Sequence, residues 1–428
     1  VDRRDKMYTN YQGYGEWDFR KGDTKEFTHC FHIYPAMMIP QVARGLIELY
    51  GKEGDLLFDP YCGSGTSLVE GRLAGMNVYG TDLNPTARLI ARAKAINYDI
   101  GSLRKDLSKF TKDLDKELES IETLDGFEAP ENVTFERLQD WFPIKSIAEV
   151  SHCILKASKI KNSDNKNFIL IALSECLRLV SFQRNGEFKL YRIKADQRES
   201  HYVELHKLLI KRLERNMEGL EKYLDAIDET TKNVGVFDFN TVTTNGEEFM
   251  PQKPNIVVTS PPYGDSGTTV AYAQFSWLTN VWLGLDKQPP GALDRSLMGG
   301  RKEGVETFGF KPMDDALSEI LNEDEKRAKE VMHFYREYRD SMKNVASIVE
   351  SGGHVCYVVG NRTVKGTQLP TDQFTAWVFE NAGFEYLATY LRDIPNKRMP
   401  SKNSPTNKAG KKVLTMNKEY IVVLRKNY

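Results

Sequence analysis

The chain has 428 residues, 40% of them hydrophobic, and a formal net charge of −1 at pH 7, which is ample for one large core and a second module. It contains no run of about eighteen apolar residues, and its N-terminus lacks the apolar core of a secretory signal, so we expect no membrane span and a cytoplasmic location. The five cysteines form no Cys-x-x-Cys pair, and neither a disulfide framework nor a bound metal is expected.

The N-terminal quarter of the chain predicts an arm followed by alternating helices and strands. Residues 1–26 are rich in aromatic side chains and interrupted by glycines, and we predict that they form an arm. Residues 27–98 follow the order helix, strand, helix, strand, helix, with Pro85 at the start of the last helix. The first strand is the apolar run at residues 56–58. It leads into a turn that consists of Asp59, Pro60, Tyr61, Cys62, Gly63, Ser64, Gly65 and Thr66.

This turn has the features of a cofactor site. Its glycines let the backbone approach a ligand with no Cβ in the way, and the helix after Thr66 offers free N–H groups at its N-terminus. The second strand ends at Asp82, which is placed to hydrogen-bond ribose hydroxyls. The order of strand, turn, helix, strand and acidic residue therefore predicts a nucleoside-containing cofactor. The turn departs from the dinucleotide fingerprint, because it lacks a third glycine and begins with Asp-Pro.

After residue 100 the pattern changes to helices with charged exposed faces. Residues 103–124 and 205–227 show helical periodicity, residues 168–179 are an apolar helical run, and residues 186–192 alternate like a short strand. Connections in parallel α/β sheets are normally short, so a segment of this length indicates an inserted domain. The predicted organisation is an arm (residues 1–26), a catalytic domain (27–100 and 231–428) and a mostly helical insertion (101–230).

The strand pattern resumes after the insertion. Strands are predicted at residues 234–237 and 255–259, and a long helix is predicted at residues 326–349. The remaining strands are predicted at residues 354–359, 386–391 and 419–424. The fold class is therefore α/β.

The strand at residues 255–259 runs into the loop that contains Ser260, Pro261, Pro262 and Tyr263. In open α/β sheets, ligands bind at the carboxyl ends of the strands. Two successive prolines stiffen the loop and lack N–H groups, which leaves backbone carbonyls without local donors. A hydroxyl, a carbonyl and an aromatic face suit a planar base that carries an exocyclic amine. For an isolated loop of this kind, a proline-rich turn without function is the alternative.

Together, the two loops resemble those of the amino-methyltransferases, which use S-adenosylmethionine to methylate exocyclic nitrogens of DNA bases. In that family, an Asp-Pro-x-x-Gly-Ser-Gly-Thr turn holds the cofactor, and a [Ser/Asp/Asn]-Pro-Pro-[Tyr/Phe] loop holds the target amine. Ser260 at the first position is typical of the cytosine-N4 enzymes, whereas adenine-N6 enzymes usually carry Asp or Asn. The resemblance covers roughly residues 27–98 and 234–428 and implies a Rossmann-like methyltransferase sheet.

The resemblance also implies roles for individual residues. In the catalytic loop, the Ser260 hydroxyl and the Pro261 carbonyl would accept hydrogen bonds from cytosine N4, while Tyr263 would stack on the base after it is flipped out of the duplex. Pro262 belongs to the same catalytic loop, and no metal is required. The implied cofactor-binding residues are Tyr34, Pro35, Asp59, Pro60, Gly63, Ser64, Gly65, Thr66, Asp82, Leu83, Asn84 and Asp238.

The basic residues are clustered, although a net charge of −1 is unfavourable for a protein that binds double-stranded DNA. One cluster lies in the insertion, at residues 184–198, and the other lies in the C-terminal tail, at residues 392–412, which includes Lys408. We predict that both clusters bind DNA and that the insertion reads part of the sequence; residues 271–310 are the other candidate for this readout. A solvated surface is the alternative for either cluster. A restriction endonuclease encoded nearby is a further partner that the resemblance suggests. The predicted DNA-binding residues are Arg184, Lys189, Arg192, Lys397, Arg398, Lys411 and Lys412.

Three alternatives stay open on the sequence alone. An adenine-N6 target is the nearest, because the same loop can hold either amine. RNA and protein-glutamine methyltransferases are a second group, although they typically carry Asn at the first position of the loop. A non-catalytic subunit that keeps the fold is the third, and the presence of both complete motifs disfavours it.

Overall fold

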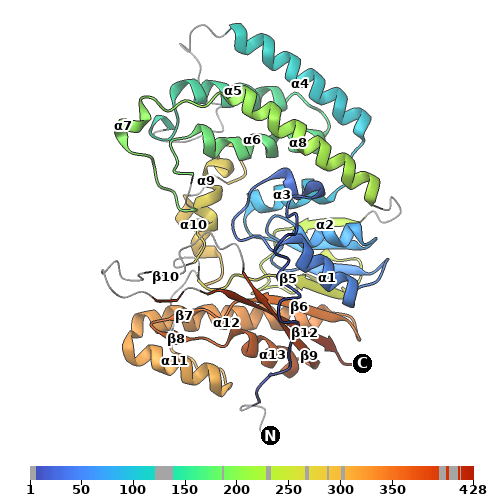
Figure 1. Cartoon of the computed structure of the whole chain (residues 1–428), viewed down its shortest axis with the longest axis vertical. Helices are drawn as coiled ribbons and strands as arrows, with labels where there is room; N and C mark the ends of the chain where they lie inside the picture. Colours follow the sequence, from blue (N-terminus) through green and yellow to red (C-terminus); the bar gives the residue numbers. More distant parts are fainter. Residues whose placement is uncertain are drawn as a thin grey trace.

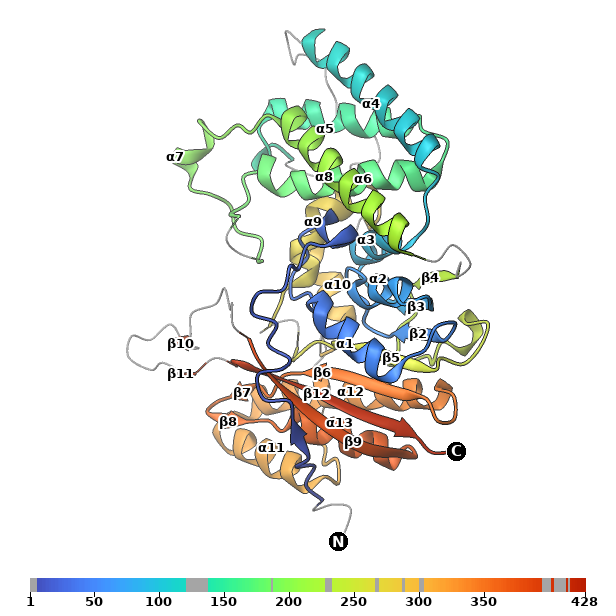
Figure 2. The same ribbon diagram turned by 45° about the vertical axis from the view of Figure 1, so that its right-hand side comes forward.

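The computed structural model of the chain describes residues 6–120, 138–185, 188–227, 233–265, 269–286, 289–299, 304–394, 402–403, 413–414 and 416–428. An eight-stranded sheet with helices against it forms one part of the molecule, and a layer of helices between residues 100 and 226 forms the other (Figure 1). The helical layer stays at the same end of the molecule when the view is turned (Figure 2).

The sheet confirms the predicted Rossmann-like methyltransferase fold. Strand β12 runs antiparallel to both of its neighbours, β9 and β6, and the other neighbouring pairs are parallel. The strands, in their order across the sheet, are β1 (Tyr11–Gln12), β9 (Phe384–Asp393), β12 (Lys418–Lys426), β6 (His354–Val359), β5 (Ile256–Thr259), β2 (Leu56–Asp59), β3 (Asn77–Thr81) and β4 (Val234–Phe237). Two short hairpins pair β7 (Thr363–Val364) with β8 (Thr367–Gln368) and β10 (Lys402–Asn403) with β11 (Val413–Leu414).

The direction of the chain reverses between β2 and β5. From β2 the chain passes to β3 and β4 on one side, and it then returns to β5 on the other side of β2. All residues of β2 and β5 are buried, as expected for central parallel strands. The carboxyl ends of these two strands flank the topological switch point, which is where open α/β sheets bind ligands.

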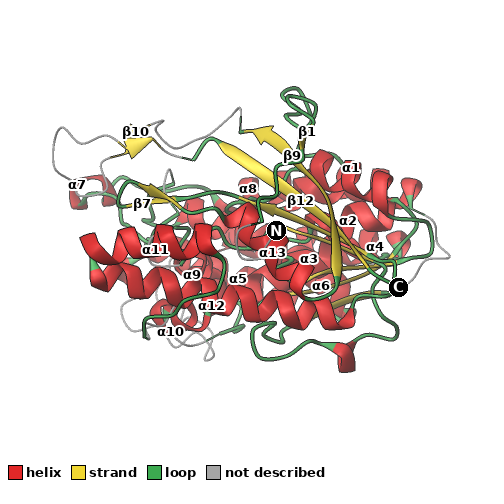
Figure 3. Ribbon diagram, turned by 90° about the horizontal axis from the view of Figure 1, so that it is seen from below, coloured by secondary structure: helices red, strands yellow, loops and turns green. Residues whose placement is uncertain are grey.

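Helices cover both faces of the sheet, because successive side chains of a strand point to opposite faces. Leu57 and Ile256 pack with helices α1 and α2, whereas Phe58 and Val257 pack with α11 and α12. Figure 3 shows helices around the strands from below. The helices of the catalytic region are α1 (Pro40–Tyr50), α2 (Thr66–Leu73), α3 (Pro85–Ala95), α9 (Tyr272–Trp282), α10 (Pro290–Ser296), α11 (Lys311–Glu323), α12 (Glu325–Ile348) and α13 (Thr371–Asn381), with 3-10 turns η2 (Phe27–Phe31) and η4 (Glu247–Phe249).

The segment predicted as a helical insertion is mostly helical. It contains α4 (Ile100–Ser120), η3 (Leu138–Asp140), α5 (Ile144–Ala157), α6 (Ser163–Val180), α7 (Ala195–Arg198) and α8 (Leu205–Ala226). The strand expected at residues 186–192 is not formed in the described part, where a single bridge joins Gln183 and Arg192. The reason is tertiary packing: the Leu190 N–H donates to Gln274 Oε1 of α9 (3.2 Å), and the Phe188 ring contacts that of Phe275.

The insertion shares one hydrophobic core with the catalytic region. Phe168 of α6 packs against Phe31 of η2 at a ring-centroid distance of 5.4 Å, and Phe142 packs against Trp282 of α9 at 5.5 Å. Buried side chains of α3, α4, α5, α6, α8 and α9 belong to the same cluster. The helical layer is therefore continuous with the wall of the catalytic region.

The predicted N-terminal arm lies along the edge of the sheet. Tyr11 pairs in parallel with Thr389 of β9, and its hydroxyl donates to Asp372 Oδ2 (2.8 Å). Further along, the Trp17 carbonyl accepts from Arg392 Nε (3.0 Å). The arm thus covers a strand edge that would otherwise be open to pairing with another chain.

Candidate active site

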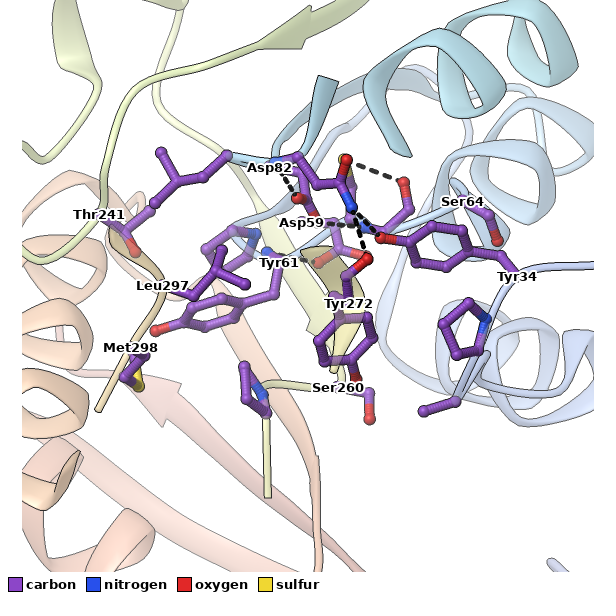
Figure 4. Close-up of a pocket in the computed structure, with 18 of the residues that line it drawn as sticks. Tyr34, Asp59, Tyr61, Ser64, Asp82, Thr241, Ser260, Tyr272, Leu297 and Met298 are labelled. Carbon is purple, nitrogen blue, oxygen red and sulfur yellow. Dashed lines mark hydrogen bonds between the residues drawn. The ribbon is translucent and has the colours of Figure 1, made fainter. Parts of the chain in front are cut away.

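A pocket lies at the carboxyl ends of β2, β3 and β5 (Figure 4). It combines the cofactor turn and the catalytic loop, which are about two hundred residues apart in the sequence. The lining residues are Tyr34, Pro35, Ala36, Met37, Met38, Asp59, Pro60, Tyr61, Cys62, Gly63, Ser64, Thr66, Asp82, Leu83, Asn84, Phe239, Asn240, Thr241, Val242, Ser260, Pro262, Gly264, Thr269, Tyr272, Leu297 and Met298.

The turn after β2 needs its glycines. Gly63 and Gly65 have φ angles of +49° and +80°, a region that residues with a Cβ rarely adopt. A Cβ at Gly65 would lie 2.8 Å from the Cα of Ala91 in α3, so the second glycine also permits the close packing of α2 on α3. The turn therefore keeps the N-terminus of α2 next to the pocket.

Asp82 holds the turn in place from the neighbouring strand. Its Oδ2 accepts from the Gly63 N–H (3.0 Å) and its Oδ1 from the Asn84 N–H (2.7 Å). Burial raises the pKa of this carboxyl above its usual range. Each carboxylate oxygen can accept more than one hydrogen bond, so Asp82 retains acceptor capacity that faces the pocket.

Asp59 joins the two strands at the switch point. Its Oδ1 accepts from Thr259 Oγ1 of β5 (2.6 Å) and from the Tyr61 N–H (3.0 Å), and its Oδ2 accepts from the Ser67 hydroxyl. Burial raises the pKa of Asp59 to about 6. The carboxylate is therefore fixed in orientation and sensitive to a nearby positive charge.

The segment before α1 forms a second wall of the pocket. The Tyr34 hydroxyl accepts from Asn84 Nδ2 (2.9 Å), which also donates to Ser276 Oγ of α9 (2.8 Å). The ring of Tyr34 stacks near Tyr272 at a centroid distance of 6.0 Å. Asn84 Oδ1 in turn caps α3 by accepting from the Thr86 N–H (3.1 Å). One amide side chain thus ties together the pocket wall, α3 and α9.

The catalytic loop presents Ser260 and Pro262 to the pocket. Ser260 Oγ lies 3.2 Å from Tyr263 Oη, and Tyr263 Oη donates to Glu419 Oε1 of β12 (3.0 Å). Burial, followed by the neighbouring Glu419 carboxylate, raises the pKa of Tyr263 well above its usual range. Tyr263 itself is not among the residues that line the pocket, and its predicted stacking on the target base stays a prediction.

Several other predicted site residues do not line the pocket. Asp238 follows β4 with a side chain that is 76% exposed, 3.8 Å from Arg88, and it is not a lining residue. The Arg192 guanidinium lies over the Trp141 ring at 5.2 Å and donates to the Asp140 carbonyl (3.2 Å). Arg184 and Lys189 lie in the same loop, where the Arg184 N–H donates to the Tyr191 carbonyl (2.8 Å). The predicted DNA-binding residues outside the described part are Lys397, Arg398, Lys411 and Lys412.

Several pocket residues were not predicted. Phe239, Asn240, Thr241 and Val242 follow β4, and the position of that strand next to β3 is the signal that could have indicated them. Leu297 and Met298 come from the segment after α10, where no local pattern indicates a ligand.

The pocket walls suit a ligand with a charged end and an aromatic end. Asp59 and Asp82 supply carboxylates, whereas Leu83, Phe239 and Val242 supply apolar surface. Carboxylates are suited to an ammonium group and to ribose hydroxyls, and apolar side chains are suited to an adenine ring. Within the described stretches, no group of three or more His, Cys, Asp or Glu side chains could hold a metal ion. No helix among them is long and apolar enough to cross a membrane.

A Rossmann-like sheet with a pocket at its switch point, lined by the glycine-containing turn and by Ser260, is the arrangement expected of S-adenosylmethionine-dependent methyltransferases. The family described as DNA methylase matches residues 3–92. The Type II methyltransferase M.MvaI of Kocuria varians is 38% identical over 432 residues, which cover 96% of this chain and 93% of that protein. The chain therefore belongs to the Type II DNA methyltransferases, and S-adenosylmethionine is its methyl donor.

Two further relatives match shorter segments. The Type II methyltransferase M.MjaII of Methanocaldococcus jannaschii is 37% identical over 111 residues, which cover 24% of this chain and 21% of that protein. A tRNA (guanine(10)-N2)-dimethyltransferase of Methanothermobacter thermautotrophicus is 44% identical over 53 residues, which cover 12% of this chain and 16% of that protein. Because these two matches cover only short segments, the family assignment rests on the match to M.MvaI, which spans nearly the whole chain.

Proposed function

We propose that this protein transfers a methyl group from S-adenosylmethionine to the exocyclic N4 of cytosine in duplex DNA. The observation that carries this proposal is the position of Ser260, which lines the same pocket as Asp59 and Asp82. A target amine held at Ser260 is therefore close to the place where the cofactor is expected. Bringing two reactants into near-attack geometry supplies a large part of the rate enhancement of such a transfer.

The pocket residues would divide the cofactor among them. Asp59 would meet the methionine ammonium group, because it is a buried carboxylate whose orientation is fixed by Thr259 and Ser67. Asp82 would accept hydrogen bonds from the ribose hydroxyls. Leu83 and Val242 would contact the adenine ring. When it is bound, S-adenosylmethionine supplies an electrophilic methyl group on a sulfonium.

The catalytic loop would make the target amine more nucleophilic. The lone pair of cytosine N4 is delocalised into the ring, so the amine is a poor nucleophile. Hydrogen bonds from its two N–H groups to Ser260 Oγ and to the Pro261 carbonyl would favour a more tetrahedral nitrogen, whose lone pair would then be available for attack in line with the methyl group. As the N–C bond forms, the C–S bond would break with its electrons going to sulfur, and the methylated amine would release one proton to solvent. The base reaches the loop only after it is flipped out of the duplex.

The serine at the first position of the loop favours cytosine N4 as the target over adenine N6. Digestion of methylated duplex DNA to nucleosides, followed by mass spectrometry, distinguishes the two. N4-methylcytosine is the expected product. N6-methyladenine would replace the cytosine assignment with the adenine one, while leaving the role of the loop intact.

We infer that two basic segments, one in the insertion and one near the C-terminus, contact the duplex. In Figures 1, 2 and 3, α7 of the insertion and β10 of the C-terminal segment lie on the same side of the molecule. The loop around α7 carries Arg184, Lys189 and Arg192. Phosphate contacts position a protein on DNA, whereas base contacts give sequence specificity. We infer that the insertion contributes to recognition of the target site, and that a restriction endonuclease encoded nearby cleaves the same site.

Replacing Ser260 tests the proposed chemistry. We expect Ser260→Ala to lower the single-turnover rate of methyl transfer by about 100-fold, because an acceptor for the amine is removed, while cofactor affinity measured by calorimetry stays the same. Ser347→Ala is the matched control, since that serine lies exposed on α12 and its hydroxyl donates to the Asn344 carbonyl of the same helix. A Ser260→Ala enzyme with the normal single-turnover rate would refute the role of the loop.

A further inference from the structure

A line of four polar side chains leads from the pocket to the far strands of the sheet. Ser260 Oγ lies 3.2 Å from Tyr263 Oη, which lies 3.0 Å from Glu419 Oε1. The other oxygen of Glu419 accepts from Arg392 Nη1. Arg392 is a buried residue of β9 that sits directly opposite Glu419 of β12 in the strand register.

The charges of Arg392 and Glu419 determine which atom donates in each of these hydrogen bonds. An arginine side chain is always a donor, and an ionised carboxylate is only an acceptor. The Glu419 carboxylate, which is paired with Arg392, therefore accepts a hydrogen bond from the Tyr263 hydroxyl. The phenol keeps that proton to donate, since burial and Glu419 raise the pKa of Tyr263 well above its usual range.

The direction of the Tyr263 hydrogen bond also determines how the Ser260 hydroxyl is oriented. The Tyr263 hydroxyl has only one proton, and it donates that proton in the hydrogen bond to Glu419. Toward Ser260, the Tyr263 oxygen can therefore only accept a hydrogen bond. The Ser260 proton then points away from the pocket, and its oxygen presents lone pairs there. A serine hydroxyl, which by itself can donate or accept, is in this way restricted to accepting.

We propose that Glu419, held by Arg392, is a positioning residue that orients the Ser260 hydroxyl through Tyr263 so that it only accepts hydrogen bonds from the target amine. This inference rests on the proposed role of Ser260 and adds to it the residue that gives a neutral serine the acceptor character that Asp has at the same position in related enzymes. It also gives Tyr263 a function through its hydroxyl, apart from any contact of its ring with the base.

Glu419→Gln tests the direction of the hydrogen bonds with little change in shape. Arg392 would bind the amide oxygen of the new side chain, which turns the amide NH2 toward Tyr263. Tyr263 would then accept from that NH2 and donate to Ser260, and the Ser260 proton would turn into the pocket. We expect the single-turnover rate on duplex DNA to fall about 10- to 100-fold, with cofactor affinity by calorimetry unchanged.

A second variant and a matched control separate orientation from stability. Tyr263→Phe keeps the ring and the Arg392–Glu419 pair but removes the hydroxyl that connects Ser260 to Glu419. We expect the single-turnover rate to fall by a similar factor. The control is Glu385→Gln, because Glu385 pairs with Arg425 (2.6 Å) across the same two strands with its side chain 52% exposed. It should leave the rate unchanged.

Double variants show whether Glu419 acts through Ser260. If it does, Glu419→Gln should cause no further loss in the Ser260→Ala or the Tyr263→Phe background, because the effect depends on an intact line. A loss of the same size in those backgrounds would show that Glu419 acts independently of Ser260 and Tyr263, and would overturn the inference.

The two failures can be told apart. A slow Ser260→Ala enzyme together with a normal Glu419→Gln enzyme would overturn this inference and leave the proposed function intact. A normal Ser260→Ala enzyme would overturn the proposed function itself, whatever the behaviour of the Glu419 variant.

Discussion

At the scale of single residues, Asp82 both holds the turn after β2 and lines the pocket in which we expect the cofactor to bind. Its carboxylate is bonded to the Gly63 and Asn84 N–H groups and lines the pocket. We expect Asp82→Ala to weaken the binding of S-adenosylmethionine by about 10- to 100-fold, since charge-assisted hydrogen bonds contribute about 1.5–3 kcal/mol each. Calorimetry measures this directly.

A matched control for Asp82 is available at the other end of the same sheet. Asp55 precedes β2 and accepts from the Lys52 N–H (3.0 Å), away from the carboxyl ends of the strands. Asp55→Ala should leave cofactor affinity unchanged. An undiminished affinity of the Asp82→Ala protein would contradict its assignment to the cofactor.

The proposed contact of Asp59 with the cofactor predicts that cofactor binding depends on pH. Burial raises its pKa to about 6, and only the ionised carboxyl attracts an ammonium group. Below that pH, binding must first remove a proton, so affinity should fall about tenfold for each further pH unit, and it should level off above it. Calorimetry across this pH range should show this fall in log affinity with decreasing pH in the native protein, and a shallower fall in Asp59→Asn. Equal slopes in both proteins would argue against the contact.

The residues that could be predicted from the sequence are those with local signals. Gly65 and Asp82 follow from the spacing of a strand, a turn, a helix and a second strand, all within about thirty residues. Glu419 could not be predicted in the same way, because it is 156 residues from Tyr263 in the chain. Nothing in the sequence of β12 indicates which of its side chains meets the catalytic loop.

At the scale of elements, burial decides which strands the sequence reveals. β2 and β5 each begin with three apolar residues and are buried at every position, and they are predicted nearly to the residue. β1 consists of only Tyr11 and Gln12, one half-buried and one exposed, so no periodic pattern marks it. Its pairing with β9, from the other end of the chain, creates the strand.

The arm that contains β1 should contribute to stability. Trp17 is 6% exposed, and its ring lies 5.0 Å from that of Tyr390. We expect Trp17→Ala to lower the free energy of unfolding by about 3 kcal/mol, because a large buried side chain is removed. Urea unfolding measures the change. Tyr14→Ala, at a side chain of the same arm that is 69% exposed, should change it by less than about 0.5 kcal/mol. Similar losses in both variants would contradict the packing role of Trp17.

At the scale of the whole molecule, the two basic segments should differ in what they contribute to DNA binding. Neutralising Lys408, Lys411 and Lys412 should weaken binding to all duplexes alike, and the dependence of log affinity on log salt should become shallower by about one for each phosphate that the protein no longer neutralises. Replacing Arg184 or Arg192 should instead cost about 1–3 kcal/mol on a duplex that the protein methylates and little on a random one.

Fluorescence anisotropy on both duplexes over a range of salt concentrations tests this difference. Lys52→Ala is the control, since Lys52 is a lysine at the amino end of β2, away from the pocket. Equal losses of affinity on both duplexes for every arginine variant of the insertion would indicate that residues 271–310, and not the insertion, read the DNA sequence.

The shared core described above, together with the proposed role of the insertion in target recognition, predicts how new target specificities arise in this family. The helical layer buries its apolar side chains together with α3 and α9, so its inner surface is fitted to one particular catalytic region. Recombination that exchanged residues 101–230 alone would bring together two surfaces that had not evolved with each other. We therefore expect specificity in this lineage to diverge through substitutions in exposed loops, such as the one around α7, rather than through exchange of the whole module.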